Sequence, residues 1–135
     1  ISRRGTFRPI THIVSGSPRV GNGPFRSLFE RGVPNNLRIT IHGDPVPRVP
    51  RGRFTDLRPE RYYRHVGRLL PLTESGDIQA ADDIATVGLA RFGRHSNSVY
   101  LNAVVQLVRE AERSPSVLNV DLRALGDAER EKARD

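Results

Sequence analysis

The feature that most constrains the fold is the order of segments in the first part of the chain. Pro9 to Val14 is a short β-branched run that ends in a Ser-Gly-Ser-Pro turn. Gly23 to Gly32 follows with Pro24 near its start, as helices prefer, and Leu37 to Ile41 is a second strand-like segment. Two strands joined through a helix pair in parallel with a right-handed crossover. The sequence therefore predicts an α/β fold.

The two predicted strands differ in the burial that their patterns indicate. The apolar residues of Pro9 to Val14 are nearly continuous, which is typical of a strand covered on both faces. His12 within this strand is therefore expected to be a core histidine with satisfied hydrogen bonds. Leu37 to Ile41 alternates its apolar residues with Arg38 and Thr40, so we expect one of its faces to be more open.

Two later segments also have recognisable patterns. Tyr62 to Thr73 reads as a third strand or as a hairpin arm. Ser96 to Arg113 is the clearest helix, with Ser96 or Asn97 as its cap and Pro115 as its stop. Its predicted apolar face consists of Tyr100, Val104, Leu107, Val108 and Ala111.

The rest of the chain is expected to form connections and a tail. Arg51 to Arg61 reads as an arginine-rich loop, and the connection after Thr73 is expected to include a short helix from Ala80. Residues 115–135 read as a polar C-terminal tail, which leaves residues 1–114 as the folded domain. The chain begins at Ile1 and contains no Met, so we expect it to be a fragment or a processed chain and not a native open reading frame.

Composition narrows the classes of function. The net charge is +7, and all Lys and Arg residues except Lys132 are arginines. Such a surface could attract anionic membranes or nucleic acid, but a general arginine bias of the source proteome explains the excess more simply. Nucleic acid is not expected as a partner, because the arginines are scattered and are not interleaved with aromatic residues. The absence of Cys excludes disulfides and thiolate metal sites. No metal or cofactor is expected, since the histidines and acids lack metal-ligand spacing.

One carboxylate, Asp44, directly follows the second predicted strand. Functional groups gather at the carboxyl ends of strands in open α/β sheets. Pro45, Pro47 and Pro50 fix φ at three positions after this acid and stiffen its loop. Such a loop suits the acid of a catalytic triad, which must hold a histidine in one orientation. Taken alone, however, an Asp-Pro pair is more often a simple turn opener.

The histidines compete for the role of a base. His95 directly precedes the long helix, where a loop can direct its ring over the sheet edge, or where it is merely a polar residue that leads a helix. His65 is the rival base, but its neighbours Tyr63 and Val66 favour packing under the acid loop or a backbone hydrogen bond. His42 either supports the acid or simply belongs to the loop.

Four motifs occur along the chain in this order: THIVSGSPRVGNGPF, RITIHGDPVPRVP, YYRHVG and RHSNSVYL. Together they resemble landmarks in the second half of a class 3 lipase, the fungal-lipase-like branch of the α/β-hydrolases. The first is similar to the family's strand and its Gly-x-Pro-Arg-Val-Gly-Asn turn. The second resembles the loop that bears the triad acid, which maps to Asp44. The third contains a histidine, His65, that the resemblance makes non-catalytic, and the fourth places the triad base at His95. The resemblance covers Thr11 to about Leu107.

The resemblance implies the C-terminal part of an α/β-hydrolase fold, with parallel strands and crossover helices, incomplete without an upstream segment. It also implies a carboxylic ester hydrolase that acts on lipids, of the triacylglycerol lipase or phospholipase A type. Asp44 and His95 would then be the catalytic acid and base. The chain contains no Gly-x-Ser-x-Gly, and Ser15 and Ser17 lack the spacing of a nucleophile elbow. We therefore expect the nucleophilic serine upstream of or outside this chain, and we expect this chain alone to be inactive.

The partners implied by this resemblance are a lipid ester substrate and the upstream half of the same protein. The arginine excess adds an anionic membrane surface as a candidate partner. The alternative hypothesis is a non-catalytic, lipase-derived module that binds anionic phospholipid membranes or a protein partner. The sequence leaves the compartment undetermined, with a secreted or effector-like protein among the open options.

Overall fold

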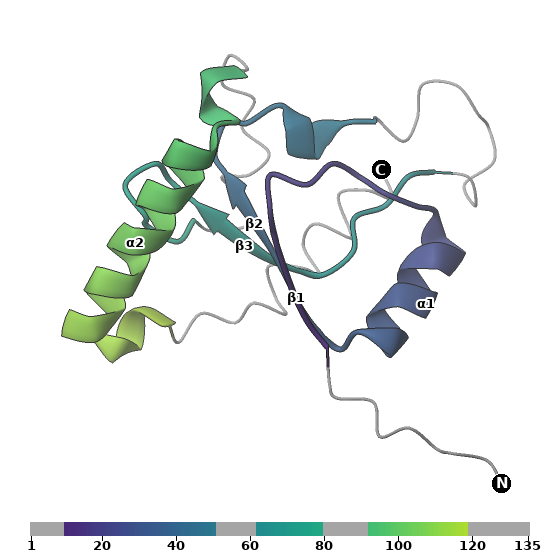
Figure 1. Cartoon of the computed structure of the whole chain (residues 1–135), viewed down its shortest axis with the longest axis horizontal. Coiled ribbons are helices and arrows are strands. Elements are labelled where there is room, and N and C mark those ends of the chain that lie inside the picture. The colour runs from purple at the N-terminus through teal and green to yellow at the C-terminus, as the bar shows by residue number, and fades with distance from the viewer. Residues whose placement is uncertain (1–9, 51–61, 80–91, 119–135) are drawn as a thin grey trace, which may run out of the picture.

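The computed structural model describes residues 10–50, 62–79 and 92–118, which form a sheet between helices (Figure 1). The sheet has the strand order β1-β2-β3. Its strands are β1 (Thr11–Ser15), β2 (Asn35–Ile41) and β3 (Arg68–Leu72), and its long helices are α1 (Gly23–Gly32) and α2 (Asn97–Arg113). The predicted loop Arg51 to Arg61, the predicted helix from Ala80 and residues 119–135 of the predicted tail lie outside the described residues.

Both strand pairs are parallel, which confirms the predicted α/β class. Ile13 of β1 pairs with Leu37 of β2, and Leu37 pairs in turn with Arg68 of β3. The third segment therefore contains a parallel strand, and the hairpin alternative also holds locally, because Leu72 forms an isolated antiparallel bridge with Ile78. Its first part does not join the sheet, because Arg64 forms an isolated antiparallel bridge with Gly21 instead.

The two helices cover opposite faces of the sheet. α2 packs on the face that contains the odd-numbered residues of β2, where the core consists of Ile39, Ile41, Leu70, Leu72, Tyr100, Ala103 and Leu107. On the other face, the ring of His12 packs edge-on against Phe29 of α1, with ring centroids 5.2 Å apart. The register places His12 beside Asn36, on the face opposite the α2 core.

The structure corrects both predictions about strand burial. β1 is an edge strand among the described strands, and its residue Ile13 is 61% exposed because α2 covers β2 and β3 instead. His12 is accordingly half-buried against a helix and is not a core residue. Conversely, β2 lies between two strands, so Arg38 and Thr40 on its supposedly open face are buried.

Helix α2 begins and ends close to the predicted positions, but its apolar face is different. Ser96 is the N-cap, and its hydroxyl accepts a hydrogen bond from the Val99 N–H. Val108 is exposed, whereas Ala103 is fully buried, so the packed stripe runs through Tyr100, Ala103 and Leu107. After α2, Pro115–Leu118 form a short 3-10 helix whose Val117 packs against the core.

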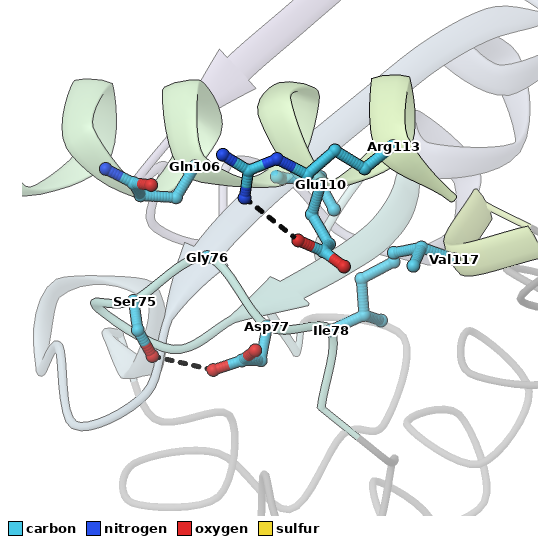
Figure 2. A pocket seen from close by; sticks show the side chains of 9 residues that line it. Ser75, Gly76, Asp77, Ile78, Gln106, Glu110, Arg113 and Val117 are labelled. Atoms are coloured by element: carbon cyan, nitrogen blue, oxygen red, sulfur yellow. Dashed lines mark hydrogen bonds and ion pairs between the residues drawn. The ribbon is translucent and has the colours of Figure 1, made fainter. Parts of the chain in front are cut away.

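A cavity of about 450 Å³ lies between the loop after β3 and the C-terminal half of α2 (Figure 2). Its wall combines backbone and polar side chains of residues 75–78 with Gln106, Glu110 and Arg113. Ser75 donates to Asp77 across the loop, at 2.6 Å. Gly76 lets the loop approach the helix, because a Cβ there would lie 2.6 Å from the Ala103 carbonyl oxygen.

Among the described residues, no helix has the length and apolar character needed to cross a bilayer.

Candidate active site

The carboxyl ends of the three strands meet beneath the segment that leads into α2. Gly16 follows β1, Asp44 lies in the loop after β2, and Glu74 lies in the loop after β3. Arg94 and His95 cross this end of the sheet immediately before the N-cap of α2. Parallel strands bring their following loops to one edge, which is where functional groups gather in open α/β sheets.

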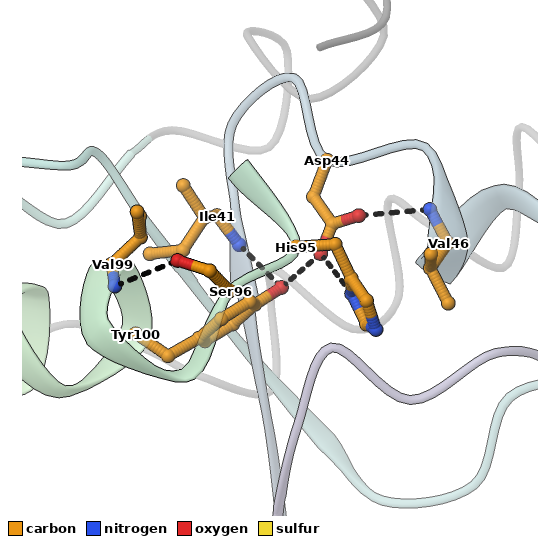
Figure 3. Close-up of polar contacts among 7 residues, drawn as sticks. All are labelled: Ile41, Asp44, Val46, His95, Ser96, Val99 and Tyr100. Atoms are coloured by element: carbon orange, nitrogen blue, oxygen red, sulfur yellow. Dashed lines mark hydrogen bonds and ion pairs between the residues drawn. The ribbon is translucent and has the colours of Figure 1, made fainter. Parts of the chain in front are cut away.

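Asp44 is the buried polar centre of this edge, and its side chain is 0% exposed. Its Oδ1 accepts a hydrogen bond from the Val46 N–H at 2.8 Å. Its Oδ2 lies 2.9 Å from Nδ1 of His95 and accepts a hydrogen bond from the Tyr100 hydroxyl at 2.6 Å (Figure 3). Three polar groups therefore hold the carboxylate in one orientation.

The local sequence explains the rigidity of the acid loop. Gly43 has φ +83°, a conformation that glycine adopts without steric cost, and the following Asp44 N–H donates to the Ile41 carbonyl at 3.1 Å. Pro45 then leads into a 3-10 turn, Val46–Arg48, that buries Pro47. The predicted stiffening by prolines therefore takes the form of a short helical turn directly after the acid.

His95 is placed between the buried acid and solvent, with a side chain that is 41% exposed. Figure 3 shows one ring nitrogen facing Asp44 and the other directed away from it. Gly16, with φ +62°, lies directly against the ring, because a Cβ added there would be 2.8 Å from Cε1 and 2.9 Å from Nδ1. The ring is thus held on one side by a carboxylate and on another by bare backbone.

Tyr100 connects the acid to the sheet. Its hydroxyl accepts a hydrogen bond from the Ile41 N–H at 3.2 Å and donates to Asp44. Burial, together with the hydrogen bond to Asp44, raises the pKa of Tyr100 above its usual value. The hydroxyl therefore remains a proton donor throughout the neutral range. The sequence predicted Tyr100 only as an apolar helix residue, and nothing in the spacing indicated a role for its hydroxyl.

The structure buries His65 against the acid loop. This histidine is buried, and its pKa falls to about 2, chiefly through burial and then through the charges of Arg38 and Arg19. A hydrogen bond with the backbone of Pro47 acts in the opposite direction and fixes the ring beneath the acid loop. A ring with such a pKa remains neutral at physiological pH, as expected of a structural residue.

His42 contributes its backbone to the site. Its N–H donates to the Leu72 carbonyl at 2.9 Å, and its own carbonyl accepts a hydrogen bond from Nη1 of Arg94 at 2.7 Å. The same guanidinium forms an ion pair with Glu74. Arg94 thereby joins the loops after β2 and β3, a contact that sequence reasoning missed.

Within the described residues, no three His, Asp or Glu side chains are grouped as a metal ion requires.

Comparison with known proteins relates part of this chain to a family. The family model described as lipase (class 3) matches residues 1–54. Phospholipase A1 EG1, chloroplastic/mitochondrial, from Oryza sativa subsp. indica is 38% identical over 88 residues, which is 58% of this chain and 20% of that protein. These matches show that the chain is similar to the class 3 lipase family. A second relative, phospholipase A1-Igamma1, chloroplastic, from Arabidopsis thaliana is 26% identical over 130 residues, or 87% of this chain and 25% of that protein.

The chain spans a fifth to a quarter of the length of the curated relatives it matches. The residues matched by the family model include β1, α1, β2 and Asp44, whereas His95 and Tyr100 come later in the chain. The pairing of the acid with a histidine more than fifty residues away is therefore a finding of the structure alone. No solved structure matches the chain.

Proposed function

We propose that Asp44 and His95 are the acid and base of a Ser-His-Asp triad in a lipid ester hydrolase of α/β-hydrolase fold. The observation that carries this proposal is the 2.9 Å approach of His95 Nδ1 to Asp44 Oδ2, with the acid buried and the histidine half-exposed. A triad needs this asymmetry, because the acid orients the ring from below while the other ring nitrogen must reach a nucleophile and a substrate.

In the proposed reaction, Nε2 of His95 takes the proton from a serine hydroxyl as that oxygen attacks the ester carbonyl. The same nitrogen then returns the proton to the departing alcohol, and a water molecule repeats both steps to release the fatty acid. Asp44 accepts the Nδ1–H of the ring, which fixes the tautomer that leaves Nε2 free as a base. Tyr100 and Val46 prevent the carboxylate from rotating out of this position.

The nucleophile of this triad lies outside residues 1–135. The chain contains no Gly-x-Ser-x-Gly, the turn that presents the serine in this fold. A segment elsewhere in the complete protein would supply the serine and the N–H groups that stabilise the oxyanion. The 135 residues alone would consequently be catalytically inactive.

The proposed substrate is an acyl ester of a phospholipid. Two relatives carry the name phospholipase A1, and the arginine excess of this chain suits an anionic membrane surface. Triacylglycerol is the alternative within the same reaction class. Mass spectrometry of the products distinguishes them, since a phospholipid substrate yields a lysophospholipid and a free fatty acid.

The test compares variants of the complete protein on phosphatidylcholine and phosphatidylglycerol vesicles and on a triacylglycerol emulsion. We expect Asp44→Asn to lower kcat about 10⁴-fold and His95→Gln to lower it at least as far. The matched controls are Asp77→Asn, an exposed aspartate, and His12→Gln, a histidine on the other face of the sheet. Both controls should retain the wild-type rate.

Two outcomes would contradict the proposal. Hydrolysis that survives His95→Gln would show that another group is the base. A wild-type protein that hydrolyses none of these lipids, yet floats with anionic vesicles to the same extent as both site variants, would instead establish the non-catalytic binding module.

A further inference from the structure

We propose that Arg94 is a positioning residue that sets the separation between the acid loop and the segment carrying His95. Its effect on catalysis rests on the function proposed above, whereas its effect on the His95 ring does not. Arg94 contacts the His42 carbonyl and Glu74 through its guanidinium. It acts through the backbone of the acid loop and through its own peptide bond to His95.

The guanidinium of Arg94 makes two contacts that span the site. Nη1 donates to the His42 carbonyl at 2.7 Å, two residues before Asp44 in the chain. The Nε side of the group forms an ion pair with Glu74, which lies two residues beyond the end of β3. One planar group therefore links the segment before α2 to the loops that follow two neighbouring strands.

Gly43 supplies an independent observation that points to the same role. Its φ of +83° turns the chain between His42 and Asp44, and a Cβ built on it would collide with Nη1 of Arg94. The bare backbone of Gly43 thus forms the surface on which the guanidinium rests. Arginine suits this position because its rigid planar group can donate Nη1–H to one loop while its charge pairs with a carboxylate on another, which a lysine ammonium on a flexible stem cannot reproduce.

Arg94 directly precedes His95 in the chain, so its contacts with the acid loop can affect the position of the His95 ring. His95 lies between this clamp and Ser96, whose hydroxyl accepts a hydrogen bond from the Val99 N–H and caps α2. Both neighbours of the histidine are therefore fixed, one to the acid loop and the other to the helix. Loss of the clamp would release one of these two anchors and allow the ring to move relative to Oδ2 of Asp44.

An ordinary surface ion pair is the competing interpretation. The side chains of Arg94 and Glu74 are 24% and 50% exposed, and exposed pairs contribute little to stability. The two interpretations predict different measurements. A surface ion pair would affect stability slightly and leave the His95 ring unchanged, whereas a positioning residue would change the ring and the rate with little change in stability.

The experiment uses the complete protein and the variants Arg94→Ala, Arg94→Lys and Glu74→Gln. The matched control is Arg109→Ala, which removes the same charge from an exposed position on α2. The first measurement is steady-state hydrolysis of phosphatidylcholine vesicles. The second is the tautomer of the His95 ring, read from ¹H–¹⁵N long-range NMR spectra of protein labelled with ¹⁵N-histidine, at a pH where the ring is neutral. The His95→Gln variant assigns the signal.

We expect Arg94→Ala to lower kcat by about 10- to 100-fold with little change in KM, as a small misplacement of a catalytic group does. The ring should change from the Nδ1–H tautomer to a mixture of both tautomers. Arg94→Lys should recover part of the rate because it can keep the His42 contact, and Glu74→Gln should give a smaller defect of the same kind. Arg109→Ala should match the wild type in both measurements.

The two measurements separate this inference from the proposed function. A wild-type protein without hydrolase activity would refute the function, yet a tautomer change in Arg94→Ala would still support the positioning role. An active protein in which Arg94→Ala and Arg94→Lys keep the wild-type kcat and tautomer would overturn the inference and leave the triad intact. Should Arg94→Ala fail to fold, Arg94→Lys and Glu74→Gln decide the matter by the same criteria.

Discussion

The hydroxyl of Tyr100 approaches Oδ2 of Asp44 more closely than the ring of His95 does, at 2.6 Å against 2.9 Å. The same hydroxyl accepts the Ile41 N–H, so the acid of the proposed triad is tied to the last residue of β2 through one side chain. A buried carboxylate that must remain in one orientation benefits from such a support, because each additional hydrogen bond restricts its rotation.

Replacement of Tyr100 by Phe tests this support. We expect kcat to fall about tenfold, since a hydrogen bond to a charged group contributes about 1.5–3 kcal/mol. The free energy of unfolding should also fall, by about 1–3 kcal/mol, because the buried Ile41 N–H loses its acceptor. Tyr63→Phe, on an exposed tyrosine, is the control. Steady-state kinetics and urea denaturation measure both effects, and an unchanged kcat would show that the hydroxyl does not support the acid.

Gly16→Ala tests whether bare backbone is required beside the ring. The new Cβ would lie 2.8 Å from Cε1 of His95, so the ring must move away, and a misplacement of this kind costs about 10²-fold in rate. The φ of +62° adds a penalty of about 1–2 kcal/mol to the folded state. Gly23→Ala is the matched control, since nothing lies near its position. A Gly16→Ala protein with the wild-type kcat would contradict the geometry of the site.

His65 makes stability depend on pH. Its pKa is about 2 in the folded state, from an ordinary value of 6.5, so below about pH 6.5 the unfolded chain binds a proton that the folded chain does not. The contribution of the neutral, buried ring to the free energy of unfolding is fully present above pH 6.5. Below that pH the free energy of unfolding falls by about 1.4 kcal/mol per pH unit. Urea denaturation of the wild type and of His65→Gln between pH 7 and pH 5 measures it. Equal pH slopes for the two proteins would contradict the burial of a neutral ring.

Ser15 and Ser17 flank the glycine that touches His95, so they are the serines of this chain to test as nucleophiles. Ser15 ends an exposed edge strand, and the Ser17 hydroxyl donates to the Pro18 carbonyl at 3.2 Å. We expect Ser15→Ala and Ser17→Ala in the complete protein to keep full labelling by a fluorophosphonate probe and full activity. Loss of labelling in either variant would place the nucleophile on this chain.

The sequence was most informative where glycine and proline mark the ends of elements. The turn after Ser15, the Asp44 loop and the Pro115 stop are all close to where the sequence predicts them, because these residues restrict the backbone directly. The parallel order of β1 and β2 follows from the helix between them. These signals depend only on neighbouring residues, so they can be interpreted without knowledge of the rest of the fold.

Burial was harder to predict because it depends on position within the sheet. Ile13 and Arg38 show this most clearly: the isoleucine is 61% exposed on an edge strand, and the arginine is 2% exposed on the central strand. Their residue types alone indicate the reverse. Strand order decides the outcome, and a period-2 pattern does not encode strand order.

The contacts of the candidate site could be predicted only in part. Asp44 and His95 were identified by their places in motifs, and the structure brings them to hydrogen-bond distance. Tyr100 and Arg94 were missed because each acts through an atom whose partner lies more than fifty residues away in the chain. Helical spacing predicts that the ring of a tyrosine is buried, but it does not predict the partner of the hydroxyl. The net charge counts an arginine but does not predict which acceptor it contacts.

The placement of β1 at the margin of the sheet has a practical consequence. One side of this strand offers amide and carbonyl groups that no other described strand occupies, next to an outward-facing isoleucine. We expect such an edge to pair with a further strand, either from the complete protein or from a second copy of the chain. Biochemical work on this site should therefore begin with the complete protein.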